Sequence, residues 1–328
     1  MRRVLLILAS LAFLGGCAAP SGGSDTRLAL VAYSTPREAY ADLIHAFQAT
    51  PDGSGVSFDE SYGGSTEQTR AVQEGLPADV VALSLEPDIT GLVKSGLVDA
   101  NWNHDQARGM VTNSVVALVV RKGNPRAIHD WSDLLQPGIE VITPNPFTSG
   151  GARWNILAAY GAQVRQGRSA DEAVAYLRAL FSHVPVQAKS AREALQAFIG
   201  GKGDVMLAYE NEAVTAQQHG EAIDYVVPDA TVLIENPAAV TARSEHPQQA
   251  RAFLSFLQSP AAQRILGRAG YRPVTPDVAA EFSYPKPAQL FTIEDLGGWS
   301  AVEARFFDRQ SGIVAELFRT QGVPVDGR

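Results

Sequence analysis

The stretch "IEVITPNPFTSGGARWNILAAYG", residues 139–161, holds a strand pattern, a loop and a helix pattern in direct succession. Four of its first five residues are β-branched, which is typical of a buried strand. Two prolines then interrupt regular structure, and Ser149, Gly150 and Gly151 stand directly before a helical pattern. The stretch therefore predicts a strand-loop-helix unit of an α/β fold, in which the backbone is bare of side chains where the helix begins.

The same alternation of strand and helix patterns extends along the chain. In the first third, strand patterns at 28–33, 56–62 and 78–84 are each followed by a helical pattern. A second α/β unit occupies roughly residues 116–236, and a last helical run is predicted over 299–318. This order favours α/β architecture with a largely parallel sheet. A length of 328 residues with 45% apolar composition suits two domains, each with its own core.

The N-terminus has the order of charges and apolar residues that is typical of a signal peptide. Arg2 and Arg3 precede eleven residues that are almost all apolar, too few to span a bilayer, and small residues then lead to Cys17. This order resembles the lipobox of a bacterial lipoprotein, so we expect a signal peptide over 1–16, lipid on Cys17 and a flexible tether over 17–26. A plain secretory signal is the alternative. Cys17 is the only cysteine, so no internal disulfide is expected.

Charge and motifs argue against several functions. Without residues 1–16 the chain has 27 − 2 = 25 basic and 35 acidic residues, a net charge of −10, and no long basic run. Nucleic acid is therefore not expected as a partner. The histidines lack metal-ligand spacing, and the usual nucleotide-binding and serine-hydrolase motifs do not occur. We expect no enzymatic activity, no cofactor and no metal.

Four loops share one pattern, in which a strand is followed by small polar residues or glycine and then by a helix start. They cover residues 33–38, 62–68, 148–154 and 189–195, and Ser65 and Ser190 are the expected helix caps of two of them. The first turn of a helix has unpaired backbone N–H groups and a partial positive charge, so it can bind an anion. One such loop alone is better explained as a capped helix after a tight turn, whereas several in one cleft would form an anion site.

Longer motifs carry a family resemblance. The segment "RKGNPRAIHDWSDLLQPGIEVITPNPFTSGGARWNILAAYG", with "YGGSTEQ", "GDVMLAYENEA" and "LFTIEDLGGW", resembles the sulfate-binding proteins of bacterial ABC importers. The resemblance covers nearly all of the chain from Leu28 onward. It implies a two-lobed periplasmic binding protein of type II, with mixed, mainly parallel sheets flanked by helices and a hinge between the lobes. It also implies delivery of sulfate to an ABC permease that is driven by a separate ATPase.

The resemblance implies a set of sulfate donors, which are Ser65 in the first lobe and Ser149, Gly150, Gly151, Ala191 and Tyr209 in the second. Ser149 would act through its hydroxyl and Tyr209 through its phenol, and the others through backbone N–H groups. The implied supporting residues are Ser34, Arg37, Gly64, Ser190 and Arg192. Two positions depart from a well-known branch of the family, because Tyr209 replaces a tryptophan and Ser34 replaces an aspartate.

The expected organisation places residues 27–115 with 237–328 in lobe 1 and residues 116–236 in lobe 2. The hinge is expected near 112–117 and 233–240. The resemblance implies a monomer outside the cytoplasm, lipid-anchored to the cell membrane, on the periplasmic side where the envelope has two membranes.

Selectivity follows from the donors. A bound dianion without a proton needs donors alone, so we expect no carboxylate to line the site and expect phosphate, which carries a proton, to bind poorly. Thiosulfate or another tetrahedral oxyanion is the alternative ligand, and molybdate suits the resemblance less well because it is larger. Outside the binding-protein class, the alternatives are an envelope-anchored hydrolase and a purely structural lipoprotein.

Overall fold

The computed structural model describes residues 26–185, 187–322 and 325, so Cys17, the signal peptide and nearly all of the tether lie outside the described residues. The strands are β1 Thr26–Tyr33, β2 Val56–Gly63, β3 Val80–Ala82, β4 Met110–Arg121, β5 Val141–Pro144, β6 Gln187–Ala188, β7 Val205–Tyr209, β8 Ile223–Val226, β9 Ala230–Val240 and β10 Gln289–Phe291. The helices are α1 Arg37–Gln48, α2 Ser65–Gln73, α3 Glu86–Lys94, η1 Trp131–Leu135, α4 Gly150–Arg165, α5 Ala170–Ser182, α6 Ala191–Ile199, α7 Glu210–Gln218, α8 Pro247–Leu257, α9 Pro260–Arg268, α10 Pro276–Ala279, η2 Glu294–Leu296, α11 Gly298–Val302, η3 Glu303–Phe307 and α12 Ile313–Thr320.

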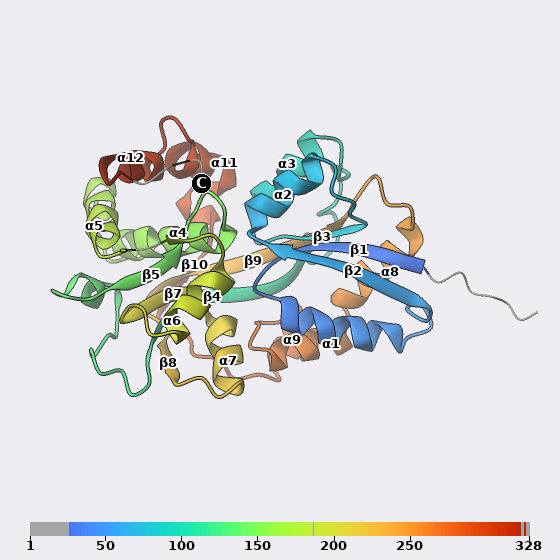
Figure 1. The fold of residues 1–328 in the computed structure, drawn as a ribbon, viewed down its shortest axis with the longest axis horizontal. Coiled ribbons are helices and arrows are strands. Elements are labelled where there is room, and N and C mark those ends of the chain that lie inside the picture. Colours follow the sequence, from blue (N-terminus) through green and yellow to red (C-terminus); the bar gives the residue numbers. More distant parts are fainter. Residues whose placement is uncertain (1–25, 186, 323–324, 326–328) are drawn as a thin grey trace, which may run out of the picture.

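Two lobes are joined by the long strands β4 and β9, which run through the middle of the molecule (Figure 1). The strand order is β2-β1-β3-β9-β4-β7-β5-β6, with β8 also on β4 and β10 on β9. The first lobe is built around β1, β2 and β3, and the second around β5, β6 and β7. The predicted α/β class and the two-lobed binding-protein fold are confirmed.

The direction of pairing changes where the lobes meet. Within the lobes, β1 is parallel to β2 and β3, and β5 is parallel to β6 and β7. By contrast, β4 and β9 are antiparallel, because the chain passes into the second lobe along β4 and returns along β9. Each lobe therefore has a mixed sheet, because β4 also pairs antiparallel with β7 and β8, and β9 pairs antiparallel with β3. The expected hinge segments lie in this β4–β9 pair, where Val115 is opposite Leu233 and Thr112 opposite Asn236.

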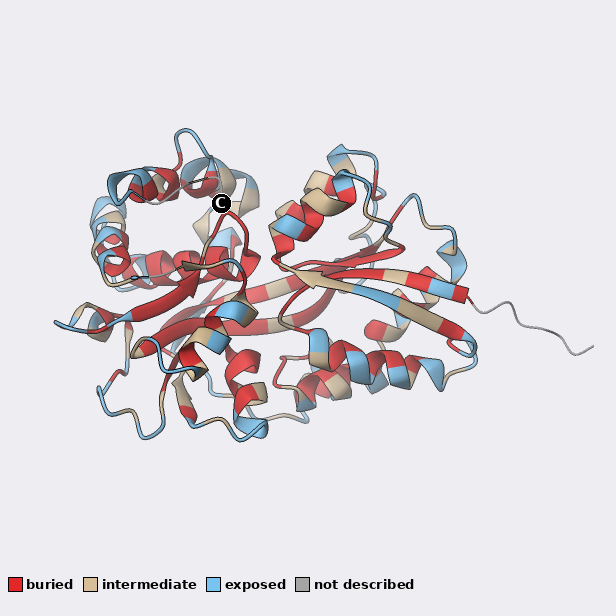
Figure 2. Ribbon diagram, in the orientation of Figure 1, coloured by how far each residue is buried: buried red, intermediate tan, exposed pale blue. Residues whose placement is uncertain are grey.

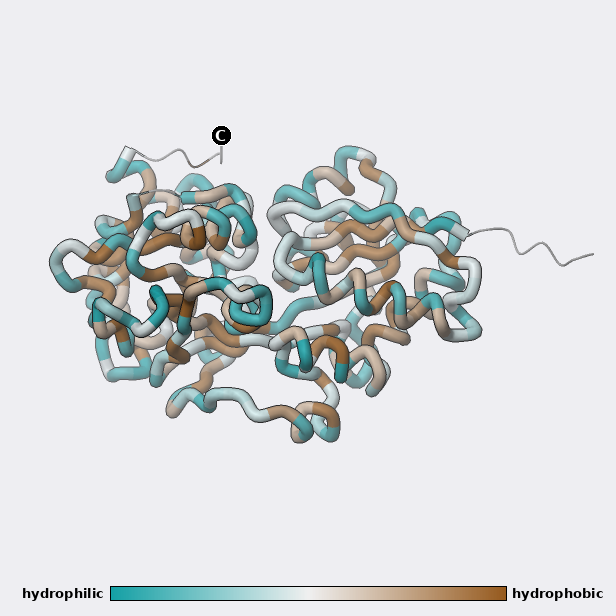
Figure 3. The backbone as a smooth tube through the Cα atoms, turned by 60° about the horizontal axis from the view of Figure 1, so that its bottom comes forward, coloured by the Kyte–Doolittle hydropathy of each residue, from teal (hydrophilic) through white to brown (hydrophobic). Residues whose placement is uncertain are grey.

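Each lobe has its own apolar core. In the first, the ring of Phe47 on α1 packs against Phe253 on α8 at a centroid distance of 5.2 Å. The buried strands of both lobes lie between helices with exposed outer faces (Figure 2), and hydrophobic segments run through the interior of each lobe (Figure 3). In the second lobe α4 is buried on every side from Gly150 to Gln163. This helix therefore needs a cover on its outer face.

The chain's last helices provide this cover, which corrects the expected domain boundaries. Trp299 on α11 packs against Trp154 of α4 at 4.9 Å, and Phe306 on η3 packs against Tyr160 of α4 at 4.8 Å. Phe318 on α12 continues this contact, 5.5 Å from Phe147 and 5.7 Å from Phe181 on α5. These rings belong to the apolar core of the second lobe, whereas the sequence assigned residues 237–328 to the first. The assignment overlooked that α4 has no polar face and must be enclosed by apolar residues from elsewhere in the chain.

The predicted helical run over 299–318 is not continuous. It divides into α11, the π-helical turn η3 and α12, with a break after Phe307. The carboxylate of Asp308 accepts hydrogen bonds from the backbone N–H groups of Gln310 and Ser311 at 2.9 and 2.8 Å. An aspartate that bonds to nearby backbone in this way stabilises a turn in place of a helix.

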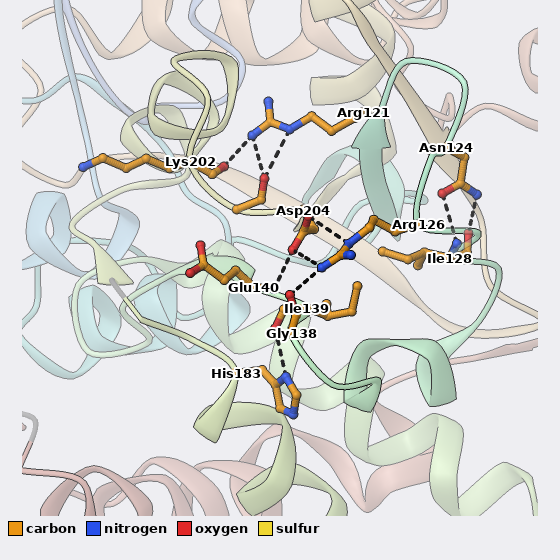
Figure 4. A network of polar contacts seen from close by, with 11 residues as sticks. Arg121, Asn124, Arg126, Ile128, Gly138, Ile139, Glu140, His183, Lys202 and Asp204 are labelled. Carbon is orange, nitrogen blue, oxygen red and sulfur yellow. Dashed lines mark hydrogen bonds and ion pairs between the residues drawn. The ribbon is translucent and has the colours of Figure 1, made fainter.

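A polar network connects the end of β4 with the segments that precede β5 and β7 (Figure 4). The guanidinium of Arg121 donates to the carbonyl oxygens of Phe198 and Lys202, both at 2.7 Å. Asp204 accepts from the backbone of Glu140 at 2.9 Å and pairs with Arg126 at 3.1 Å. These contacts satisfy loop carbonyls at the ends of strands, so we assign this network a structural role.

Candidate functional site

The loop between β5 and α4 is held by its own polar groups. The side chain of Asn145 accepts from the Phe147 N–H at 2.8 Å, and its carbonyl accepts from the Ser149 N–H at 2.9 Å. Arg153 donates from Nε to the carbonyl of Pro146 at 2.9 Å. The backbone of Ser149 caps α4 in an extended conformation, and its hydroxyl makes no capping bond. The Ser149 side chain and the first N–H groups of α4 therefore keep their donors for another partner.

Three of the predicted donors surround one narrow hollow in the second lobe. A Cβ atom added at Gly151 would lie 3.5 Å from Cε1 of Tyr209, 3.6 Å from Oγ of Ser149 and 3.7 Å from Cβ of Ala191. Gly151, Ala191 and Tyr209 line this hollow together with Glu212, and in this structure it is too small to hold a water molecule. The starts of α4 and α6 and the end of β7 therefore meet in this structure.

The two lobes come close together at two glycines, Gly64 before α2 of the first lobe and Gly150 at the start of α4 in the second. A Cβ added at Gly64, which precedes α2, would collide with the carbonyl oxygen of Thr148. A Cβ added at Gly150 would lie 2.6 Å from Oγ of Ser84 and 2.9 Å from Cγ of Leu85. Side chains at either position would hold the lobes apart. Residues from α2, α4 and α6 lie side by side because these positions carry no side chain.

Ser65 has a different role from the one expected of its side chain. It is the first residue of α2, and Gly64 is the cap residue, so the predicted cap by Ser65 is wrong. The Ser65 hydroxyl instead donates to Oδ2 of Asp88 at 2.5 Å and accepts from the backbone N–H of Ser84 at 2.9 Å. Burial raises the pKa of Asp88. Only the backbone N–H of Ser65 is left to face a ligand, which is the group that the resemblance implies.

The phenol of Tyr209 contacts the opposite lobe. Its ring is buried, and its hydroxyl lies 2.7 Å from Oγ of Ser84. Asn236 on β9 donates to the Ser84 carbonyl at 2.9 Å and lies 3.5 Å from the Tyr209 hydroxyl. The sequence reasoning missed both Ser84 and Asn236. Ser84 does follow a strand pattern and precede a helix, which is the arrangement that marked the other loops.

A carboxylate lies at the edge of the hollow, so the expectation that none lines the site is wrong. Glu212 on α7 is buried, and its Oε2 accepts from the Tyr209 N–H at 3.2 Å. Burial raises the pKa of Glu212 to about 7, and the Tyr209 N–H, Arg192 and Thr35 oppose that rise. Its charge is therefore sensitive to pH near neutrality.

Three of the predicted supporting residues have the following places in the structure. Ser190 caps α6 through its hydroxyl, which accepts from the Glu193 N–H at 3.2 Å, as predicted. Arg192 bonds to Glu38 of the first lobe at 2.8 Å. Ser34 is buried just after β1.

Arg37 does not join these residues. Its side chain is exposed to solvent, and its guanidinium lies 5.5 Å from the centre of the Tyr62 ring. In the part of the chain that the structure describes, no group of three or more metal-ligating side chains occurs, and no helix is both long and apolar enough to cross a membrane.

The site is electropositive through its backbone. The N-termini of α2, α4 and α6 each carry a partial positive charge of about half a unit. Arg153 is paired with Glu303 at 2.5 Å and Arg192 with Glu38, whereas Arg70 on α2 donates to the Phe147 carbonyl at 3.3 Å. Backbone N–H groups and hydroxyls are the donors closest to an anion in this place, which suits a compact oxyanion.

Comparisons with known proteins agree with this geometry. The family model described as "Bacterial extracellular solute-binding protein" matches residues 28–272. The sulfate-binding protein of Synechococcus elongatus is 43% identical over 88% of this chain and 86% of its own length. The structure of the sulfate-binding protein of Mycobacterium tuberculosis is 47% identical with a TM-score of 0.84, and the match covers 86% of this chain and 100% of that one. A thiosulfate-binding protein of Pseudomonas aeruginosa is 34% identical over 84% of this chain and 88% of its own length.

Proposed function

The chain belongs to the family of bacterial extracellular solute-binding proteins, and we propose that it binds sulfate between its two lobes and delivers it to an ABC permease. The observation that carries the proposal is the meeting of three helix N-termini with the hydroxyls of Ser149 and Tyr209. The proposed donors are Ser65, Gly150, Gly151 and Ala191 through backbone N–H groups, and Ser149 and Tyr209 through hydroxyls.

The energetics of such a site are favourable only if many donors act together. Removing an isolated dianion from water costs tens of kcal/mol by simple solvation estimates. About seven charge-assisted hydrogen bonds, at roughly 1.5 to 3 kcal/mol each, return on the order of 10 to 20 kcal/mol. The partial charges of the helix N-termini add to this locally, so the net acidity of the chain does not oppose binding.

Selection against phosphate follows from the donors. Sulfate has no proton near neutral pH, whereas phosphate retains at least one and needs an acceptor for it. Glu212 is the one carboxylate at the edge of this hollow, and its Oε2 already accepts from the Tyr209 N–H. The other groups proposed to face the ligand are donors, so we expect the phosphate proton to weaken binding relative to sulfate.

Thiosulfate is the second candidate ligand, because a relative that is 34% identical carries that name. Calorimetric titration of the purified protein with sulfate, thiosulfate, molybdate and phosphate distinguishes these candidates. We expect stoichiometric binding of sulfate at one site per chain, weak binding of phosphate and no turnover. A binding isotherm for none of the four anions would exclude the proposed function, and release of a product would favour a hydrolase.

The proposal includes the place where the protein acts. We propose that Cys17 carries the lipid that anchors the chain outside the cytoplasm, with the 17–26 segment as tether and a monomer as the working form. Mass spectrometry of the protein extracted from membranes tests this. The wild type should carry a diacylglyceryl-type mass increase at its N-terminus, and Cys17→Ser should release an unmodified protein from the membrane fraction.

A further inference from the structure

Ser84 lies where the proposed donors of both lobes meet. It follows β3 in the first lobe and is completely buried. Its backbone N–H donates to the Ser65 hydroxyl at 2.9 Å, and its carbonyl accepts from Nε1 of Trp154, also at 2.9 Å. These two bonds, one within the first lobe and one from the second, hold the Ser84 backbone in place. The position of its hydroxyl is therefore determined by the fold.

The hydroxyl of Ser84 faces the start of α4. A Cβ added at Gly150 would lie only 2.6 Å from this oxygen, so the bare backbone of Gly150 is its neighbour. The Tyr209 hydroxyl lies 2.7 Å away on another side. Ser84 thus contacts three residues of the proposed site, namely Ser65, Gly150 and Tyr209, although no sequence motif assigns it to that site.

Asn236 influences the direction of the protons in this network. Its Oδ1 accepts from the Tyr33 hydroxyl at 3.0 Å and from Thr112 Oγ1 at 3.1 Å, which fixes the orientation of the amide. Its Nδ2 therefore faces the Ser84 carbonyl and the Tyr209 hydroxyl, at 2.9 and 3.5 Å. Either hydroxyl can be the donor across the 2.7 Å between Ser84 and Tyr209, and the bond from Asn236 to the Tyr209 oxygen favours donation from Tyr209 to Ser84.

A hydroxyl group has a single proton to donate. When Tyr209 donates to the Ser84 oxygen, the Ser84 proton remains available, and it lies beside the first N–H groups of α4. Because successive hydrogen bonds polarise one another, the bond from Tyr209 makes the Ser84 hydroxyl a stronger donor. This arrangement needs both lobes, since Ser84 comes from the first and Tyr209 from the second.

We propose that the Ser84 hydroxyl donates directly to the bound oxyanion, and that Tyr209 acts through Ser84 as a positioning residue. This inference rests on the proposed function and deepens it, because it replaces Tyr209 with a donor from the opposite lobe. It also makes one ligand contact dependent on lobe closure, since the Tyr209 hydroxyl reaches Ser84 only when the lobes touch.

The test compares sulfate affinities of four variants by calorimetry. Ser84→Ala removes the hydroxyl, Ser84→Cys keeps a similar volume with a weak donor, and Tyr209→Phe removes only the phenol oxygen. Hydrogen bonds to charged groups of about 1.5 to 3 kcal/mol predict that both Ser84 variants weaken sulfate binding by about tenfold or more. Tyr209→Phe should weaken it by less than about threefold, since Ser84 can still donate. Ser57→Ala, a partly buried hydroxyl on β2, is the control and should bind like the wild type.

The outcomes separate the inference from the proposed function. A larger loss in Tyr209→Phe than in the Ser84 variants would make Tyr209 the direct donor and overturn the inference. Sulfate binding by Ser84→Cys at wild-type affinity would also overturn it, and this variant keeps the test valid if Ser84→Ala does not fold. If the wild-type protein itself does not bind sulfate, the proposed function is wrong, and the inference about Ser84 is then wrong as well.

Discussion

The carboxylate of Glu38 on α1 lies 2.8 Å from the guanidinium of Arg192 on α6 and so joins the two lobes beside the proposed site. His219 on α7 approaches the other carboxylate oxygen at 3.2 Å. Both partners of the Glu38–Arg192 pair are more than a third exposed to solvent. Such a pair contributes little by itself, but it exists only while the lobes are in contact.

Glu38→Gln should therefore weaken sulfate binding by less than about fivefold, as expected for a partly exposed ion pair. The loss should appear mainly as faster release of sulfate, measured by stopped-flow fluorescence, and should shrink at high salt because ions screen the pair. Arg192→Gln should have the same effect, and the double variant should lose no more than either single one. A loss in Arg192→Gln far above that in Glu38→Gln would mean that Arg192 contacts the ligand itself.

Gly150→Val should prevent closure of the lobes. The added Cβ would lie 2.6 Å from Ser84 Oγ and 2.9 Å from Leu85 Cγ, both in the first lobe. We therefore expect loss of sulfate binding because the lobes stay apart, with little loss of stability.

Small-angle scattering with and without sulfate checks this prediction, and Gly91→Ala on α3, outside the proposed site, is its control. A Cβ at Gly91 would make only ordinary contacts of 3.8 Å. The radius of gyration should fall with sulfate in Gly91→Ala and the wild type, and stay unchanged in Gly150→Val. Compaction of Gly150→Val at saturating sulfate would contradict the proposed close approach of the lobes.

Glu212 should make the stability of the protein depend on pH. Burial raises its pKa from 4.5 to about 7. The unfolded chain then releases the proton more readily than the folded one, so this contribution to stability is complete below pH 4.5 and is lost as the pH rises through 7. The loss amounts to at most about 3 kcal/mol, at 1.36 kcal/mol per pKa unit.

Urea unfolding of the wild type and Glu212→Gln, without ligand, measures this effect. Glutamine keeps an acceptor for the Tyr209 N–H but does not titrate, so it isolates Glu212 from Asp88 and Glu210, whose pKa values burial also raises. The free energy of unfolding of the wild type should fall relative to that of the variant between pH 4.5 and 8. A constant difference over this range would show that the folded protein does not raise the pKa of Glu212.

Phe318→Ala should affect the loop at residues 144–149 as well as the core. Phe318 is fully buried and packs edge-on against Phe147 of that loop. Removing a buried phenyl ring costs about 3 to 5 kcal/mol, and the loop would lose its support. We expect lower stability in thermal unfolding and weaker sulfate binding at a temperature where the variant is folded. The exposed Val164→Ala on α4 should change neither. Reduced stability with unchanged affinity would limit α12 to a structural role.

Much of the local structure could be predicted from the sequence. The strand patterns before Ser34, Gly64 and Ser149 correspond to β1, β2 and β5, and Ser190 caps α6 as expected. These features depend on residues close together in the chain, and backbone preferences act at that range. The expected cap by Ser65 failed because a contact from elsewhere took its hydroxyl, since Asp88 lies within 2.5 Å.

The arrangement of the proposed site could be predicted only in part. The resemblance pointed to Gly151, Ala191 and Tyr209, and the structure brings these three around one hollow. It did not point to Ser84 or Glu212. A single serine after a strand or a single glutamate in a helix has no distinctive pattern, so only the folded chain distinguishes it from other residues of its kind.

The sequence by itself determined the order of strands and helices, the helix starts rich in N–H donors and the bare backbone of the loop at Gly150 and Gly151. The tertiary structure alone decided that Ser84 meets Tyr209 at 2.7 Å and that α11 and η3, near the end of the chain, cover α4 in the second lobe. The physical reason is the distance along the chain over which each kind of interaction acts. Periodicity and capping act within a few residues, whereas these contacts join segments more than a hundred residues apart and depend on how the lobes pack.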